Sequence, residues 1–109
     1  MNIVSEFFGQ VVRLKISGEM TIYHARELKT ELLRAVNDHQ KLEINLAEVN
    51  ELDTAGFQLL VLAKREANKA EKSLHLVNHS ESVREVLRLY RMEPYFGDPI
   101  VIPAKSSVQ

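Results

Sequence analysis

The stretch Asn50-Glu51-Leu52-Asp53-Thr54-Ala55-Gly56-Phe57 separates two segments with different hydrophobic periods. The preceding residues 41–46 (KLEINL) alternate apolar and polar side chains, which predicts a strand. The following residues 57–63 (FQLLVLA) are apolar on nearly every side, and residues 64–69 are mostly polar. This change predicts a helix, running to about Ala70, that is buried at its start and exposed at its end. The stretch is therefore predicted to contain, in order, a short loop after the strand, the acid and hydroxyl at the helix entry, and the start of a buried helix.

Asp53 and Thr54 lie at the predicted start of this helix, where short side chains with oxygen atoms cap free backbone N–H groups. The residues alone leave two interpretations of Thr54 open with equal weight. It is a helix cap, which contributes about 1 kcal/mol, or it is a phosphorylation site. A phosphate adds up to about two negative charges, which a helix N-terminus tolerates, although Asp53 partly opposes them. Such a modification is expected to change the exposed surface and to leave the fold intact.

Length and composition restrict the class of protein. The chain has 109 residues, which fits one domain with one core, and its formal net charge of −1 argues against nucleic acid as the main partner. It contains no cysteine, which excludes disulfides and thiolate chemistry. No apolar run reaches the roughly 20 residues that span a bilayer, and the N-terminus does not resemble a signal peptide. We expect a cytoplasmic protein that does not insert into membranes.

The first half of the chain predicts a hairpin followed by a helix. Residues 3–8 and 12–16 have strand patterns and are joined by a turn at Gly9-Gln10, and Gly18 ends the second strand. Glu19, Met20 and Thr21 are predicted to connect this strand to a helix over residues 22–36, with Thr21 as its N-cap. The apolar stripe of this helix consists of Ala25, Leu28, Leu32, Ala35 and Val36.

The second half predicts a strand over residues 74–77 and a helix to about Tyr90. Residues 78–81 (NHSE) offer several caps for this helix, and Asn78 and Glu81 have the spacing of a capping box. The inner side of this helix is predicted to carry Val83, Val86, Leu87 and Tyr90. A short edge strand is expected at residues 99–102, a domain boundary at residue 103, and a flexible tail over residues 104–109. Strands separated by helices predict a single α/β domain whose mixed, mostly parallel sheet begins with an antiparallel hairpin.

The residues give little support for catalysis. The four histidines have no metal-ligand spacing, and the four glycines form no phosphate-binding loop. Glu51 and Asp53 are the only carboxylates that cluster in a predicted loop. Apart from Thr54, neither has a basic or nucleophilic neighbour, so they do not form the tuned pair that acid–base catalysis needs. Lys64, Arg65, Lys69 and Lys72 alternate with Glu66 and Glu71, which predicts a solvated helix face with intrahelical ion pairs. We predict no enzyme activity, no cofactor and no metal site.

Three motifs in order resemble the STAS domain family, which includes the anti-sigma factor antagonists of bacteria. The central one is residues 53–57 (DTAGF), preceded by residues 44–46 and 49–52. The second is residues 17–21 (SGEMT) after the hairpin, and the third is residues 76–78 leading to residues 83–87. The resemblance covers about Val12 to Val101. Ala55 replaces the second serine that many antagonists carry. The polar, proline-containing residues after Val101 predict that the usual C-terminal helix of the family is shortened or absent.

The resemblance implies a function for the central motif. In antagonist members the hydroxyl directly after the motif aspartate accepts phosphate, and here it belongs to Thr54. The implied partner is a serine/threonine kinase of the histidine-kinase-like ATPase fold, often itself an anti-sigma factor, and a PP2C-like phosphatase removes the phosphate. The unphosphorylated antagonist binds the kinase. The implied partner-binding residues are Asp53, Thr54, Ala55 and Gly56, together with Glu19, Met20 and Thr21 at the same end of the sheet.

The leading hypothesis is therefore a protein-binding module for signal transduction and transcription regulation, switched by phosphorylation of Thr54. The alternative is a constitutive STAS subunit of a lipid ABC-type transporter or of a chemotaxis or signalling complex, in which Thr54 is a contact residue that is never modified. A third hypothesis is binding of a nucleotide or another small ligand, and the only sequence feature that supports it is the loop beside Thr54. The sequence leaves open whether Met20 belongs to an interface or to the core, whereas Phe57 is expected in the core.

Overall fold

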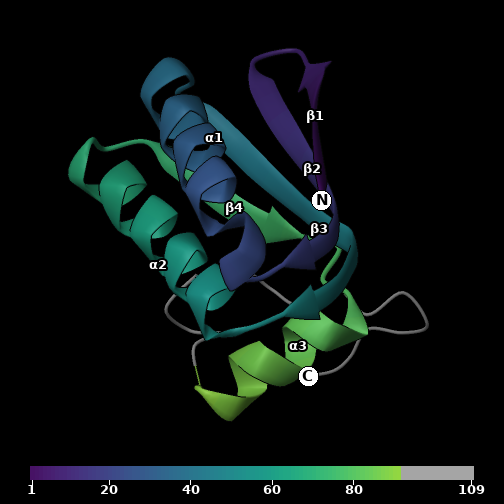
Figure 1. Cartoon of the computed structure of the whole chain (residues 1–109). Helices are drawn as coiled ribbons and strands as arrows, with labels where there is room; N and C mark the ends of the chain where they lie inside the picture. The colour runs from purple at the N-terminus through teal and green to yellow at the C-terminus, as the bar shows by residue number, and fades with distance from the viewer. Residues whose placement is uncertain (92–109) are drawn as a thin grey trace.

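The computed structural model of the chain describes residues 1–91. Figure 1 shows the elements in chain order: β1 (Asn2–Phe8), β2 (Val11–Met20), the 3₁₀ turn η1 (Ile22–His24), α1 (Ala25–Asp38), β3 (Lys41–Leu52), α2 (Thr54–Lys69), β4 (Ser73–Val77) and α3 (Glu81–Leu89). The predicted succession of strands and helices is confirmed over this range. The predicted strand at residues 99–102, the boundary at residue 103 and the tail over residues 104–109 lie outside the described residues.

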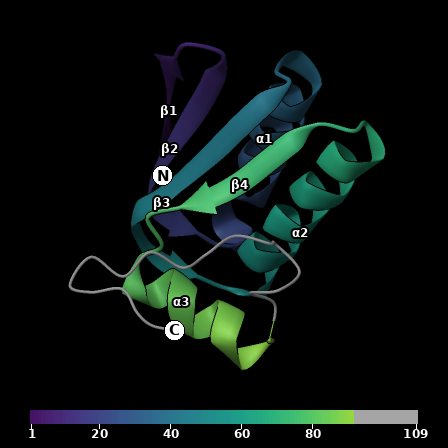
Figure 2. The same cartoon turned by 180° about the vertical axis from the view of Figure 1, so that it is seen from behind.

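The four strands form one sheet in the order β1-β2-β3-β4. β1 pairs with β2 in antiparallel orientation, whereas β2 with β3 and β3 with β4 are parallel pairs. α1 and α2 lie side by side on one face of this sheet, and α3 lies at its end next to the last part of β3 (Figures 1 and 2). The predicted α/β fold with a mixed sheet and an antiparallel N-terminal hairpin is confirmed.

The core lies between the sheet and the two long helices. Alternate residues of each strand point into it, as the period of two requires. Leu14, Ile16, Ile44, Leu46 and Leu76 from the strands are at most 4% exposed, and Leu28, Leu32 and Leu60 from the helices are at most 1% exposed. In α1 the predicted stripe is buried at Leu28, Leu32, Ala35 and Val36. The strong apolar period of these segments is what made the core predictable.

Two strands are longer than their sequence pattern suggested. β2 continues through Gly18 to Met20, and β3 continues from Leu46 to Leu52. The pairing of β2 with β3 shifts register twice, between Lys15 and Ser17 and again after Gly18. Buried residues in the second part of β3 are consequently three positions apart instead of two, at Leu46, Val49 and Leu52. Because of this irregular spacing, the sequence pattern predicted a loop for residues 49–52. That prediction was wrong, since these residues belong to β3.

The predicted solvated basic face on α2 is also corrected. Lys64 is 9% exposed, and its Nζ donates a hydrogen bond to the Leu74 carbonyl oxygen at 2.6 Å. Lys72 donates to the carbonyl oxygens of Val36 at 2.7 Å and Asn37 at 2.8 Å, near the end of α1. Within residues 1–91, Lys69 is the one of these four basic residues that keeps the predicted intrahelical pair, with Glu66 at 3.6 Å. Long basic side chains reach backbone carbonyls of other elements, and no sequence spacing indicates this.

The start of α3 uses one of the several caps that residues 78–81 were predicted to offer, but not the Asn78–Glu81 capping box. Ser80 is the N-cap, and its side chain accepts a hydrogen bond from the Val83 backbone N–H at 3.3 Å. Asn78, the predicted capping residue, has a φ of 55°, which is a left-handed conformation that asparagine tolerates in turns. The helix therefore begins at Glu81, and Val83 and Leu87 form its buried side.

Candidate functional site around Asp53 and Thr54

Asp53 joins the entrances of two helices. It is the N-cap of α2, and its Oδ1 accepts a hydrogen bond from the Gly56 backbone N–H at 2.9 Å. Its Oδ2 accepts a hydrogen bond from the Ile22 backbone N–H at 2.9 Å, at the start of η1. Its own backbone N–H donates to the Met20 carbonyl oxygen at 3.3 Å. Asp53 thus fixes the end of β2, the start of η1 and the start of α2 to one another.

This geometry corrects two predicted caps. Thr54 is the first residue inside α2, so the interpretation of Thr54 as the capping residue is wrong and Asp53 holds that role. Thr21 precedes η1 but makes no side-chain capping hydrogen bond. Its side chain is 4% exposed, and its Oγ1 has no hydrogen-bond partner within residues 1–91. The acceptor for the N–H of Ile22 comes instead from Asp53, a residue distant in the sequence.

Gly56 lets the start of α2 approach the end of β2 closely. A Cβ atom at this position would overlap the Met20 carbonyl oxygen, and it would lie 2.8 Å from the Met20 carbonyl carbon and 2.9 Å from Leu52 Cδ1. Two of these obstacles are backbone atoms, which cannot move without shifting the strand. The glycine of the motif is therefore required by packing, and it is buried.

Thr54 is exposed, and its hydroxyl lies next to the side chain of Tyr90. Its Oγ1 is 3.4 Å from the hydroxyl oxygen of Tyr90, and either group can donate in this hydrogen bond. The Tyr90 ring stacks on the Phe57 ring, with centroids 4.8 Å apart and planes inclined by 16°. Within residues 1–91, the backbone N–H groups of Thr54 and Ala55 have no acceptor. The hydroxyl is thus displayed on a helix start that has free N–H groups.

Tyr90 was missed as a site residue. The sequence pattern placed it on the inner side of α3, but it is 46% exposed and follows the last helical residue. Thr54 and Tyr90 are 36 positions apart, and no motif links them. The only signal in the sequence was an aromatic residue at the end of an amphipathic helix, which says nothing about the residue it contacts.

The predicted partner-binding residues are brought together, but not all of them face solvent. Thr54 and Glu19 are exposed, and Asp53 and Ala55 are half-buried. The side chains of Met20 and Thr21 are 0% and 4% exposed and lie in the interior. Gly56 is likewise buried.

Exposed apolar side chains adjoin the same site. Ile22, whose N–H binds Asp53, is 62% exposed, and the next residue, Tyr23, is 88% exposed. Tyr90 adds its half-exposed ring, whose hydroxyl is 3.4 Å from Thr54 Oγ1. Exposed apolar residues next to a polar loop are typical of a surface that contacts another protein.

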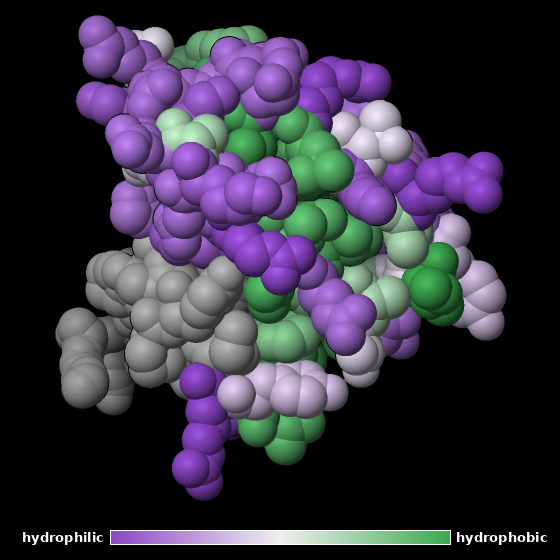
Figure 3. Space-filling view, turned by 90° about the vertical axis from the view of Figure 1, so that its left-hand side faces the viewer, coloured by the Kyte–Doolittle hydropathy of each residue, from purple (hydrophilic) through white to green (hydrophobic). Residues whose placement is uncertain are grey.

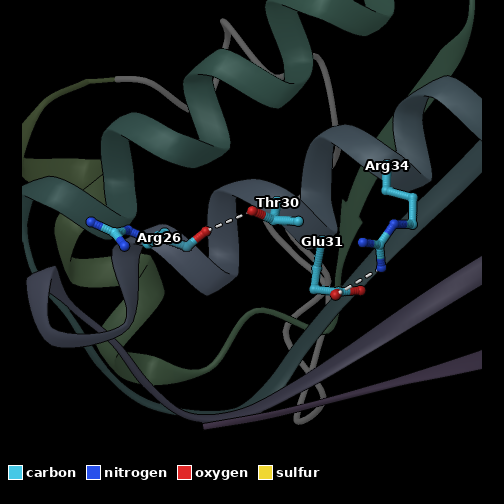
Figure 4. A network of polar contacts seen from close by, with 4 residues as sticks. All are labelled: Arg26, Thr30, Glu31 and Arg34. Atoms are coloured by element: carbon cyan, nitrogen blue, oxygen red, sulfur yellow. Dashed lines mark hydrogen bonds and ion pairs between the residues drawn. The ribbon is translucent and has the colours of Figure 1, made fainter.

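Two shallow hollows lie elsewhere on the helices. One is on α2 and is lined by Phe57, Gln58, Leu59, Val61, Leu62 and Arg65. Figure 3 shows the α1–α2 side of the molecule, where hydrophobic surface forms a strip between hydrophilic side chains. The other hollow is lined by residues of η1 and α1 from Tyr23 to Glu31. There the polar groups bond locally: Thr30 donates to the Arg26 carbonyl oxygen at 3.0 Å, and Arg34 pairs with Glu31 at 3.0 Å (Figure 4).

The described residues contain no arrangement typical of a metal site or a membrane span. No group of three or more histidine, cysteine, aspartate or glutamate side chains within residues 1–91 is placed to hold a metal ion. In the same range, no helix combines the length and the apolar composition that crossing a bilayer requires. The chemically distinctive position remains the exposed hydroxyl at the start of α2.

Comparison with known proteins agrees with this fold. The family model described as "Mlab, STAS domain" matches residues 4–101. The chain belongs to the STAS domain family. Among curated proteins, this STAS chain is similar to the anti-sigma-B factor antagonist of Staphylococcus epidermidis, with 28% identity over 85 residues. That match covers 76% of this chain and 78% of the relative.

Solved structures of two anti-sigma factor antagonists show the same fold. An anti-sigma factor antagonist from Mycobacterium paratuberculosis has a TM-score of 0.82 and 21% identity, covering 94% of this chain and 88% of that one. The anti-sigma factor antagonist SpoIIAA in its unphosphorylated form has a TM-score of 0.73 and 17% identity, covering 94% and 90%. At these identities the structural similarity shows that the fold is shared.

Proposed function

We propose that this STAS chain is a phosphorylation-switched, non-enzymatic protein-binding module of the anti-sigma factor antagonist type. In its unphosphorylated form it binds a serine/threonine kinase of the histidine-kinase-like ATPase fold, which is also an anti-sigma factor. Phosphorylation of Thr54 weakens this binding. The observation that carries the proposal is the exposed Thr54 hydroxyl on the first residue of α2, directly after the capping aspartate.

The chemistry of the switch fits this position. The kinase transfers the γ-phosphoryl group of ATP to Thr54 Oγ1, the hydroxyl proton passes to a base of the kinase, and ADP leaves. A PP2C-like phosphatase hydrolyses the ester with water and releases inorganic phosphate. The free N–H groups of Thr54 and Ala55 and the dipole of the 16-residue helix α2 favour an anion there. Asp53 already uses both carboxylate oxygens on backbone N–H groups.

Phosphorylation is expected to act on binding because the site is on the surface and its neighbours are apolar. A group with a charge near −2 on Thr54 would lie beside the exposed Ile22 and Tyr90. A partner that covers these side chains would have to bury that charge, which is costly unless the charge is paired. The core side chains of α2 are buried on the other side of the helix, so the fold is expected to persist.

The test begins with the protein isolated from its native cells. Intact-mass and phosphopeptide analysis, with identification of co-purifying proteins, is expected to find a phosphate on Thr54 and an ATPase of the stated fold. Binding of that partner is then measured for wild type, Thr54→Glu and Thr30→Glu. Thr30 is exposed on α1 (Figure 4) and provides the charge control. We expect Thr54→Glu alone to weaken binding, and equal affinity of all three proteins would contradict the proposal.

A second candidate function is a constitutive subunit of a transporter or signalling complex. The Mlab description of the matching family model favours it. In that case Thr54 is a permanent contact residue, no phosphorylated form occurs under any growth condition, and Thr54→Ala weakens assembly. Transporter or receptor subunits, instead of a kinase, would then co-purify with the chain.

A further inference from the structure

Tyr90 connects the end of α3 to the start of α2. It is the C-cap residue of α3, and its ring rests on Phe57, in the first turn of α2. Phe57 is 7% exposed and packs in the core, so it offers a fixed platform. From this platform the Tyr90 hydroxyl reaches to 3.4 Å from Thr54 Oγ1. One side chain therefore both stacks on α2 and covers part of the exposed hydroxyl.

This position matters for any group that must reach Thr54. A kinase needs room at Oγ1 for a base that accepts the proton, within about 3 Å, and for phosphorus on another side of the same oxygen. The Tyr90 hydroxyl occupies one hydrogen-bonding direction of Oγ1, and its ring fills space next to it. The Tyr23 ring is more exposed, at 88%, and it lines the hollow on η1 and α1, to which Thr54 does not contribute.

We propose that Tyr90 is a gate over Thr54, closed by stacking on Phe57 and opened when the end of α3 carries the ring away. Access to the hydroxyl is then proportional to the fraction of molecules in which the gate is open. Aromatic pairs of this kind reduce the open fraction by about two- to twelve-fold. The role of the gate in controlling phosphorylation rests on the proposed function of Thr54. The restriction of access to the Thr54 hydroxyl does not depend on that function.

The gate can be tested without a kinase because the chain contains no cysteine. The variant Thr54→Cys carries a single thiol at the gated position, and its rate of reaction with the disulfide reagent DTNB measures access. Thiolate is the nucleophile, so rates are compared on the plateau at high pH, where the thiol is fully ionised. The test variants in this background are Tyr90→Ala, which removes the gate, and Phe57→Leu, which removes the platform and keeps apolar volume. Tyr23→Ala is the control.

We expect Tyr90→Ala and Phe57→Leu each to raise the plateau rate by about two- to twelve-fold. Tyr90→Phe, which keeps the ring and its stacking, is expected to leave the rate near that of the Thr54→Cys parent, and so is Tyr23→Ala. Unfolding curves in urea verify that each variant is folded. A rate that is the same with tyrosine and alanine at position 90, in folded proteins, would overturn the gate.

A second readout separates the gate from the proposed function. Wild type and Tyr90→Ala are incubated with ATP and extract of the native cells, and phosphate on Thr54 is quantified. Faster labelling of Tyr90→Ala supports both the gate and the switch. Faster thiol reaction with no phosphate on either protein supports the gate and rejects the phosphorylation switch. Labelling of both proteins at one rate, together with unchanged thiol reaction, rejects the gate and supports the switch.

Discussion

The carboxylate of Asp53 accepts a hydrogen bond from the backbone N–H of Ile22 at 2.9 Å, across 31 positions of the sequence. The second oxygen of the same carboxylate caps α2 through Gly56. A single side chain therefore fixes the entry of the chain into η1 and α1 relative to the entry into α2. The exposed residues Ile22 and Thr54 are held relative to one another by this link, so Asp53 shapes the candidate binding surface without having to touch a partner.

Replacing Asp53 is expected to destabilise the fold. Asp53→Ala leaves two N–H groups without their acceptors, and we expect the free energy of unfolding to fall by about 1–3 kcal/mol. Asp53→Asn keeps one acceptor oxygen and should cost less. Urea denaturation followed by circular dichroism measures both. Asp38→Ala, at the exposed end of α1, is the control and should change stability by less than about 0.5 kcal/mol. Equal stability of Asp53→Ala and wild type would contradict the double-cap role.

The change in the free energy of unfolding caused by Gly56→Ala has a sign that depends on whether helix propensity or steric overlap is larger. Helix propensity alone favours alanine over glycine by about 1 kcal/mol. The overlap of a Cβ with the Met20 carbonyl oxygen opposes this, and overpacking of this kind typically costs about 1–3 kcal/mol. We therefore expect net destabilisation in thermal or urea unfolding.

The control for Gly56 is Gly9→Ala. Gly9 has open space around it but a φ of 63°, so alanine there meets backbone strain of roughly 1–2 kcal/mol and no steric overlap. Gly56→Ala is also expected to shift the amide resonances of Met20 and Asp53 in NMR spectra, because α2 must move away from β2. A stabilised Gly56→Ala variant with unchanged spectra would show that the close approach is not required.

The sequence predicted the layers of the fold because the core segments repeat regularly. Leu42, Ile44 and Leu46 are spaced by two, as a strand with one buried face requires, and all are at most 2% exposed. Leu28 and Leu32 are spaced by four, as a helix requires. The prediction failed where the period broke: the register shifts of β2 on β3 space Val49 and Leu52 by three.

The sequence predicted only those features of the site that depend on residues close together in the chain. Asp53 and Thr54 were found because capping chemistry acts within three residues of sequence. The contacts Ile22–Asp53 and Thr54–Tyr90 join residues 31 and 36 positions apart. They follow from how the sheet, η1 and α3 come together, and no local pattern encodes that arrangement.

Lys72 is expected to stabilise the fold by closing the end of α1. Its Nζ donates to two carbonyl oxygens, of Val36 and Asn37, where the partial negative charge of the helix end favours a cation. Lys72→Met keeps most of the apolar stem and loses both hydrogen bonds, so the free energy of unfolding should fall by about 1–3 kcal/mol. The control is Lys69→Met. Lys69 is 70% exposed and pairs with Glu66 at 3.6 Å, so its removal should cost less than about 1 kcal/mol.

The same comparison has a distinct salt dependence. The Lys69–Glu66 pair is exposed and should lose its small contribution in 1 M salt, where charges are screened within about 3 Å. The Lys72 hydrogen bonds are to backbone groups and partly buried, so the cost of Lys72→Met should persist there. If both lysines lost their effect equally in high salt, the contribution of Lys72 would be that of a surface charge and not of a helix cap.

Thr54→Pro tests whether Thr54 is the first residue inside α2. Proline is favoured at that position because its fixed φ suits the helix start and the missing N–H has no intrahelical partner. The N–H of Thr54 has no acceptor within residues 1–91, and Asp53 has the extended backbone (φ −102°, ψ −176°) that a residue before proline prefers. We expect the free energy of unfolding of Thr54→Pro to lie within about 1 kcal/mol of the wild-type value. Gln58→Pro, at an exposed position further into α2, should cost about 3 kcal/mol or more. A comparable loss in both variants would place the helix start later than Thr54, and the hydroxyl would then lose the free N–H groups that favour a phosphate there.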